Sequence, residues 1–486
     1  MGCVGKRVSV SLWALVLLSG CDSGSDTSSS AAIQSQPGLS VPVASVSLLD
    51  SPAKVSSGMV GAQGRRPLAC ELVQAQFEAD RTVTDIEQIQ QQLRGNEISY
   101  SRRLELLERL GWRHLALARE TFDAGYLKLA EQAGNCMNAQ VPGSAAAQLL
   151  LARSLHQQHR FAESQVLALE LVSSRGGWFD YGLLGDLQLE QGDLEAAASA
   201  YQRMMDLHPG PQAYSRAAEL RWLNGDSDGA IEMMALSARS TSARQPEAKA
   251  WALARLASFV IAQGDADTAL TLVRAALEIR PNYPPALLLS GRLWLARGDY
   301  ARAVEQLQRA AIEAPQPLYQ WPLLEALEQA GKVEAQATLQ AQLARRGADA
   351  DRRTYALYLA STSTSAAALS RALTLAQQEY AIRQDPLTLD TLALAQYRQG
   401  DLVSAWNLIS SALASGLQDP RVQLHAGMIA AARGDCQQAQ NWLNRARQPA
   451  YRLLPSEQRM LAQARCSASE QQLSNAVLSR KALLRP

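Results

Sequence analysis

The stretch Gly185–Met204, GDLQLEQGDLEAAASAYQRM, decides the fold, because it holds parts of two helical segments on either side of a glycine. Before the glycine, Leu184 and Leu187 recur at the three-residue spacing of one helical face. Gly192 can adopt the positive φ that ends a helix, and Asp193 suits the N-cap of the next helix. The stretch therefore predicts two helices joined by a tight turn.

The glycine of this turn recurs along the chain at a nearly constant interval. Gly192, Gly225, Gly264, Gly298 and Gly331 follow one another at steps of 33, 39, 34 and 33 residues, and Gly400 and Gly434 are 34 apart. An alanine comes five residues after six of these glycines: Ala197, Ala230, Ala269, Ala303, Ala405 and Ala439. A period in this range is typical of stacked helix pairs, none of which can bury its apolar face alone.

Other offsets from the glycine repeat as well. The residue seven positions earlier is always small in six units: Gly185, Ala218, Ala257, Gly291, Ala393 and Gly427. A larger side chain lies nine positions later: Tyr201, Met234, Val273, Leu307, Ile409 and Leu443. Pro209, Pro281 and Pro315 close three units, since proline cannot continue a helix.

This pattern resembles the tetratricopeptide repeat, which has a small residue at its eighth position, alanine at its twentieth and proline at its thirty-second. The resemblance covers roughly residues 143 to 450 and implies an all-α superhelical solenoid of antiparallel helix pairs. Departures are Gln336 in place of the alanine, an insertion near residues 240–246, and serines and threonines at 361–365 in place of a glycine turn.

The chain divides into five segments on this interpretation. Residues 143–348 and 349–486 are repeats, the second set ending in a C-terminal cap, and 67–142 form an N-terminal helical capping region, which a solenoid needs to cover its end. Residues 1–20 have the charged start and short apolar run of a secretion signal, and 21–66 are rich in Ser, Gly, Pro and Ala. Such a composition cannot bury enough apolar surface to fold, so 21–66 are expected to be a disordered tether.

The end of the signal, Leu18-Ser19-Gly20-Cys21, resembles the lipobox of bacterial lipoproteins. The resemblance implies that Cys21 is lipidated and anchors the chain in a membrane of the bacterial cell envelope, facing the periplasm. Asp22 is a weak indication of the inner rather than the outer membrane. The alternative is an ordinary cleavable signal with a different cleavage site.

Charge and cysteines set further limits. The formal net charge is +1, or about −1 without Lys6 and Arg7 of the signal, so no basic field exists to attract nucleic acid. Four cysteines remain besides Cys3 and Cys21, and an even number outside the cytoplasm favours disulfides. Of three connectivities, only the local one avoids bridging distant ends of a rod; it joins Cys70 to Cys136 and Cys436 to Cys466. Four free thiols are the alternative.

No motif of an enzyme is present: the chain has no phosphate-binding glycine loop, no Cys-x-x-Cys and no nucleophile elbow. The sequence therefore predicts a protein that is not an enzyme and needs no cofactor. His156 and His159 are three residues apart and could share a metal, although the sequence offers no third ligand.

What remains is a binding surface. The resemblance implies that the first helix of each repeat lines a concave groove, and its register places nine candidate residues there: Phe179, Asp186, Leu189, Glu219, Trp222, Trp251, Arg292, Trp321 and Glu325. Tryptophan and arginine dominate binding energy at interfaces. The alternative is that the three tryptophans only pack between repeats.

The expected function is a scaffold that binds a protein or peptide partner and helps assemble an envelope complex of the secretion, pilus or exopolysaccharide type. The alternative is an envelope enzyme or a chaperone for a metalloenzyme, with a site assembled across repeats near the two histidines.

Overall fold

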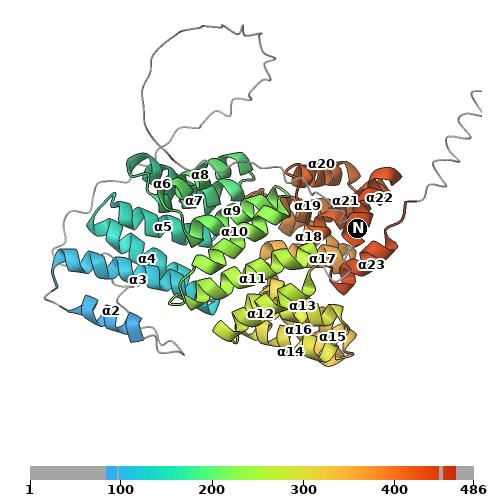
Figure 1. Ribbon diagram of the computed structural model, residues 1–486, viewed down its shortest axis with the longest axis horizontal. Helices are drawn as coiled ribbons and strands as arrows, with labels where there is room; N and C mark the ends of the chain where they lie inside the picture. Colours follow the sequence, from blue (N-terminus) through green and yellow to red (C-terminus); the bar gives the residue numbers. More distant parts are fainter. Residues whose placement is uncertain (1–69, 71–83, 96–97, 448–452, 467–486) are drawn as a thin grey trace, which may run out of the picture. The chain divides into compact units, whose positions relative to one another are not determined.

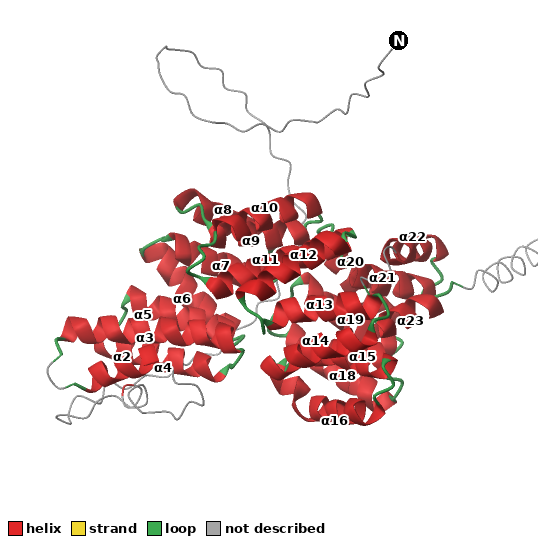
Figure 2. Cartoon of the chain, turned by 60° about the horizontal axis from the view of Figure 1, so that its bottom comes forward, coloured by secondary structure: helices red, strands yellow, loops and turns green. Residues whose placement is uncertain are grey.

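The structure is a computed structural model that describes residues 70, 84–95, 98–447 and 453–466 (Figure 1). The expected signal (1–20), Cys21, the tether (21–66) and the start of the N-terminal cap lie outside the described residues. Within the described residues every regular element is a helix, and Figure 2 shows no strand. None of these helices is long and apolar enough to span a bilayer.

The helices follow one another as antiparallel pairs, which confirms the all-α solenoid. In the part of the chain that the structure describes, the regular pairs are preceded by α2 (Thr84–Arg94), α3 (Tyr100–Thr121) and α4 (Gly125–Gln140). The first pairs are α5 (Ala145–Gln157) with α6 (Phe161–Ser174), α7 (Trp178–Glu190) with α8 (Leu194–Leu207), α9 (Pro211–Leu223) with α10 (Ser227–Ser240), and α11 (Pro246–Gln263) with α12 (Ala266–Ile279).

The pairs continue to the C-terminal end of the described chain. They are α13 (Pro284–Ala296) with α14 (Tyr300–Glu313), α15 (Pro317–Gln329) with α16 (Val333–Ala350), α17 (Arg352–Thr362) with α18 (Ala366–Tyr380), α19 (Pro386–Arg398) with α20 (Leu402–Leu413), and α21 (Pro420–Ala432) with α22 (Cys436–Arg447). The short helix α23 (Pro455–Gln463) is the last one within the described residues.

The turns obey the rule inferred from the sequence. Gly192 has a φ of 79°, in the left-handed region that only glycine adopts without strain. The carboxylate of Asp193 then accepts the backbone N–H of Ala196 at 2.9 Å and so caps α8. The same capping contact recurs from Asp226, Asp265, Asp299, Asp401 and Asp435.

Small residues allow the two helices of a pair to approach closely. The six recurrent alanines are all fully buried. A Cβ added to Gly427 would lie only 2.6 Å from Cγ of Leu443, and one added to Gly291 would overlap Leu307. A larger residue at these positions would therefore push the pair apart, since interiors are close-packed.

The departures from the repeat pattern change the structure locally. Around Gln336, helix α16 is longer than its equivalents and buries only Leu343 and Gly347. The insertion at 240–246 is a connection between α10 and an α11 of 18 residues. The serine and threonine stretch at 361–365 forms the end of α17 and the turn to α18, which contains no glycine.

Two disulfides lie at the ends of the described chain. Cys70 is joined to Cys136 of α4, and Cys436 at the start of α22 is joined to Cys466. These are the pairings that the sequence analysis favoured. The partners are 66 and 30 residues apart, so each of these two disulfides stays at one end of the described chain.

Early and late repeats also touch, which the sequence analysis did not predict. The backbone N–H of Gln384 donates to the carbonyl of Glu190 at 2.7 Å. The hydroxyl of Ser415 donates to the carbonyl of Leu223 at 2.6 Å. These contacts join the ends of α7 and α9 to the segments that precede α19 and α21. We call this set of contacts the seam.

Candidate functional site

A network of arginines and carboxylates runs along the first helices of successive pairs. Asp186 of α7 is its most heavily bonded member: it accepts from Arg153 at 2.9 Å, from Arg216 at 2.7 Å through two nitrogens, and from the hydroxyl of Tyr201 at 3.0 Å. Burial by itself would raise the pKa of Asp186, but Arg216 and Arg153 outweigh it and hold that pKa well below its usual range. Asp186 is therefore an anion that ties α5, α7, α8 and α9 together.

The next carboxylate, Glu219 of α9, is held in the same way. Both of its oxygens accept from the guanidinium of Arg255 at 2.5 Å. Arg255 also lies over the ring of Phe259, which stacks on Trp222 with ring centres 4.8 Å apart. Trp222 is only 9% exposed, so it packs between α9 and α11.

Four of the nine candidate residues come together at one open pocket. Asp186, Leu189, Glu219 and Trp251 line a cavity of about 290 Å³, which we call the α7–α11 pocket. Its remaining walls are His156, Glu190, Tyr201, Ser215, Arg216 and Leu223. The indole of Trp251 is 37% exposed, the largest exposure of the three candidate tryptophans.

His156 contributes an uncharged wall to this pocket. Both of its ring nitrogens are covered from solvent and have no hydrogen-bond partner. Burial is the main cause that lowers the pKa of His156 to about 4, so the ring is neutral at neutral pH. His159 lies in the following turn with a φ of 59°, and both histidine rings pack on Phe161. The described residues contain no group of three potential ligands arranged to hold a metal ion.

Glu190 lies at the point where the pocket meets the seam. Its carboxylate is 3.5 Å from the guanidinium of Arg383, which also pairs with Glu379. Burial raises the pKa of Glu190 to about 6, because the neighbouring arginine compensates only part of the lost hydration.

The remaining candidates lie elsewhere. Phe179 packs edge-on against Trp112 and Trp178. Arg292 lines two small cavities of about 180 and 160 Å³ together with Asp419 and Arg421.

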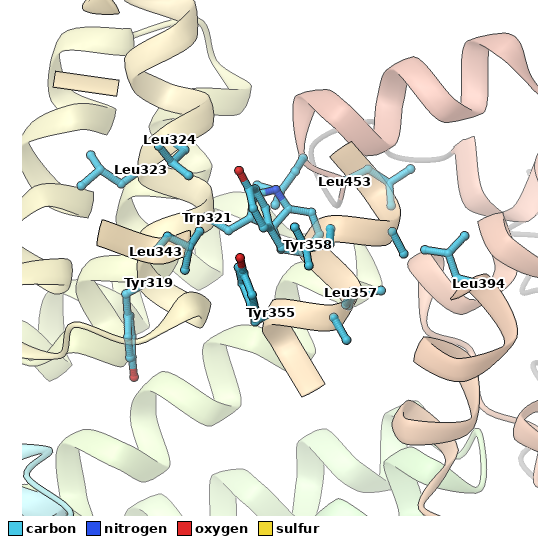
Figure 3. Close-up of a cluster of buried hydrophobic side chains, with 14 of the residues drawn as sticks. Tyr319, Trp321, Leu323, Leu324, Leu343, Tyr355, Leu357, Tyr358, Leu394 and Leu453 are labelled. Atoms are coloured by element: carbon cyan, nitrogen blue, oxygen red, sulfur yellow. The ribbon is translucent and has the colours of Figure 1, made fainter. Parts of the chain in front are cut away.

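Trp321 belongs to a buried hydrophobic cluster (Figure 3), and Glu325 is also buried. Trp321 is 2% exposed, packs against Tyr358, and donates its Nε1–H to Glu325 at 2.5 Å. Glu325 in turn accepts from the backbone N–H of Ser456 at 2.8 Å and from its hydroxyl. This carboxylate therefore attaches α23 to α15. Trp222 and Trp321 are thus both largely buried, Trp222 against Phe259 of α11 and Trp321 against Tyr358 of α17. Trp222 also lines the cavity of about 180 Å³ near Arg292.

Several residues of the site were missed from the sequence. Arg153 precedes Asp186 by 33 residues, one repeat, so the same register that selected Asp186 could have found it. Arg216 and Arg255 lie 30 and 36 residues from their carboxylates, and the repeat period is again the signal. Glu190 has no such signal, because its neighbour Arg383 belongs to a distant repeat.

The comparisons with known proteins agree with this geometry. Residues 183–243 and 260–327 match tetratricopeptide repeat models. With the helix pairs and turns described above, these matches identify the chain as a tetratricopeptide-repeat protein. Repeats of this kind are interaction modules, whose stacked helices form extended binding surfaces.

The chain is also similar, at low sequence identity, to several solved structures. Pseudomonas aeruginosa PilF is 13% identical, with a TM-score of 0.36, and the match covers 41% of this chain and 90% of PilF. Yeast Tom70 is 12% identical, with a TM-score of 0.36 and coverage of 79% and 92%. Human IFIT1, in a dimer with PPP-AAAA, is 14% identical, with a TM-score of 0.42 and coverage of 79% and 93%. No curated protein sequence matches the chain.

Proposed function

We propose that the protein is a lipid-anchored scaffold of a bacterial cell envelope, facing the periplasm, and that it binds a protein or peptide partner at the α7–α11 pocket. Its role would be to assemble or organise an envelope complex of the secretion, pilus or exopolysaccharide type. The observation that carries the binding role is the pocket itself. It exposes an aromatic side chain, Trp251, between helices whose charged residues already hold one another in place.

The lipid anchor is inferred from the stretch Leu18-Ser19-Gly20-Cys21, whose cysteine would carry the lipid. Several acyl chains together hold a protein firmly on a membrane, whereas one gives marginal binding. We expect wild-type protein to stay in the membrane fraction after a high-salt wash and the Cys21→Ser protein to leave it or to remain unprocessed. A Cys21→Ser protein that is processed and still remains in the membrane fraction after the high-salt wash would refute the lipid anchor.

Partner capture can be tested by placing a photoreactive phenylalanine at position 251. Position 100 is the matched control, because Tyr100 is 56% exposed but lies on α3, away from the pocket. We expect light-dependent adducts with one envelope protein from position 251 and none with that protein from position 100. Identical adducts from both positions, or none from 251, would contradict a partner site at the pocket.

A further inference from the structure

The charged side chains that line the α7–α11 pocket are unequal in number. They comprise three carboxylates, those of Asp186, Glu190 and Glu219, and one guanidinium, that of Arg216. Asp186 already accepts from Arg153, Arg216 and Tyr201, so its oxygens are occupied. Glu190 and Glu219 are the two acceptors that remain for a ligand.

The arginines that compensate these two carboxylates do not line the pocket. Arg255 holds Glu219 and Arg383 lies beside Glu190, but neither arginine contributes to the pocket walls. A carboxylate has about four acceptor sites, so a bidentate arginine leaves room for a further donor. The side chains of Glu219 and Glu190 are 27% and 20% exposed, so both are accessible to a further hydrogen-bond donor.

The other walls suit a long aliphatic stem. Leu189 and Leu223 are apolar, and the indole of Trp251 adds an aromatic wall that is 37% exposed. A cation over an indole face is attracted by the ring's quadrupole, and the effect grows as the site is desolvated. Lysine and arginine combine such a stem with a charged end. The volume of about 290 Å³ has room for one such side chain.

We propose that the α7–α11 pocket receives one cationic side chain, a lysine or an arginine, from an extended segment of the partner. The stem lies between Leu189, Leu223 and Trp251, and the charged end donates hydrogen bonds to Glu219 and Glu190. The proposal rests on the proposed function, since it specifies the partner that docks at this surface. An acidic side chain would add a further carboxylate beside Glu219 and Glu190 and be repelled by them, and an apolar one would bury their remaining acceptor sites without a donor.

The state of Glu190 agrees with this occupant. Burial raises its pKa to about 6, and a cation placed beside it would favour the ionised form and lower that pKa again. His156, which lines the same pocket, stays neutral at pH 7 and does not repel a cation.

The test uses defined peptides and the whole folded chain. The probe is the acetylated, amidated pentapeptide Ala-Ala-Arg-Ala-Ala, and the comparison peptides carry citrulline or glutamate in place of arginine. Citrulline has nearly the shape of arginine but no charge. Binding is measured by the ¹⁹F shift of 5-fluorotryptophan at position 251, assigned with Trp251→Phe protein. We expect the arginine peptide to bind at least tenfold more tightly than the citrulline peptide and the glutamate peptide not to bind.

Two variants and a control complete the test. Glu219→Gln should abolish most of the preference for arginine over citrulline, whereas Glu105→Gln should not, because Glu105 lies on α3 and is 64% exposed. Trp251→Leu keeps an apolar wall at an exposed position and should weaken both peptides, measured by calorimetry. It also serves if Glu219→Gln fails to fold. Equal binding of arginine and citrulline, or an unchanged preference in the folded Glu219→Gln protein, would overturn the proposal.

The outcomes separate this proposal from the proposed function. A preference for arginine without a crosslinked partner from position 251 would support the cationic pocket and count against the scaffold. A crosslinked partner without any preference for arginine would support the scaffold and overturn the cationic pocket.

Discussion

Tryptophans on the first helices of different pairs differ in how far they are buried, and burial decides whether the side chain is accessible to a partner. Trp251 is 37% exposed at the edge of a pocket, whereas Trp321 is 2% exposed and bonded to Glu325. Both were placed in the groove by the same repeat register. The difference arises because Tyr358 of α17 and Arg421 of α21 pack on the indole of Trp321.

The first prediction follows from this contrast. Trp321→Ala should lower the free energy of unfolding by about 3–5 kcal/mol, since it opens a cavity and removes one of the three donors to Glu325. Trp251→Ala should change it by less than about 1 kcal/mol but weaken partner capture. Urea denaturation of both variants measures the first effect, and crosslinking or peptide binding measures the second. Equal loss of stability in the two variants would show that Trp251 also belongs to the core.

Another residue-scale prediction concerns His114, which is 4% exposed and stacks on Tyr126. Burial, with a smaller effect of Arg113, lowers its pKa from 6.5 to about 4. As the pH falls, His114 is therefore protonated in the unfolded chain before it is protonated in the folded chain. The stability that neutral His114 contributes is present above pH 6.5 and is lost as the pH falls toward 4.

His114→Phe keeps the ring but removes the titration. Between pH 6.5 and 4, wild-type protein should lose up to about 3 kcal/mol more unfolding free energy than His114→Phe. Denaturant melts at half-unit steps of pH give the difference directly. Parallel pH curves for the two proteins would mean that His114 is not buried in its neutral form.

At the scale of elements, the glycine turn is the unit that the sequence repeats. Gly225 and Gly298 have nearly the same backbone, with φ of 77° and 76°. A Cβ on Gly298 would meet nothing within 4 Å, but one on Gly225 would strike the carbonyl of Gly416, which lies at the seam. The two glycines thus separate the conformational role of a turn from its tertiary contact.

Alanine at these two glycines should therefore have unequal effects. Gly298→Ala should cost about 1–2 kcal/mol, the price of a left-handed conformation for a residue with a Cβ. Gly225→Ala should cost at least about 1 kcal/mol more, because it must also displace the segment around Gly416. Thermal melts of both variants, with identical helix content as the control, check the order. A larger loss of stability for Gly298→Ala than for Gly225→Ala would contradict the close contact between Gly225 and Gly416 at the seam.

For the whole molecule, the seam and the two disulfides limit how the chain can unfold. A linear solenoid is stabilised by neighbouring repeats alone and can unravel from its ends. Here Glu190 and Leu223 also bind segments almost 200 residues later in the chain. The ends are closed by Cys70–Cys136 and Cys436–Cys466. Unfolding should consequently be more cooperative than nearest-neighbour contacts alone would allow.

The disulfides give the prediction at this scale. On the chain-entropy model, loops of 66 and 30 residues are worth roughly 3–4 kcal/mol each. The double variants Cys70→Ser/Cys136→Ser and Cys436→Ser/Cys466→Ser should each lose about that much. Proteolysis should then begin at the end whose bridge was removed. Peptide mapping that finds all four cysteines alkylated without reductant would remove the basis of this prediction.

Much of the architecture could be derived from the sequence because it depends on local rules. A glycine with positive φ followed by a capping aspartate ends one helix and starts the next wherever it occurs. Small residues such as Gly291 and Ala303 mark where two neighbouring helices must approach. The local pairing of cysteines follows from the same nearest-neighbour order.

The tertiary structure alone decided which residues of the inner helices remain accessible. The repeat register assigns a side chain to a face of its helix, and four of the residues that it selected, Asp186, Leu189, Glu219 and Trp251, line one pocket. It cannot tell which distant helix later covers that face, because this depends on the small rotations between many successive pairs. Those rotations bring Ser456 to Glu325 and Gln384 to Glu190, close one part of the inner surface and leave the α7–α11 pocket open.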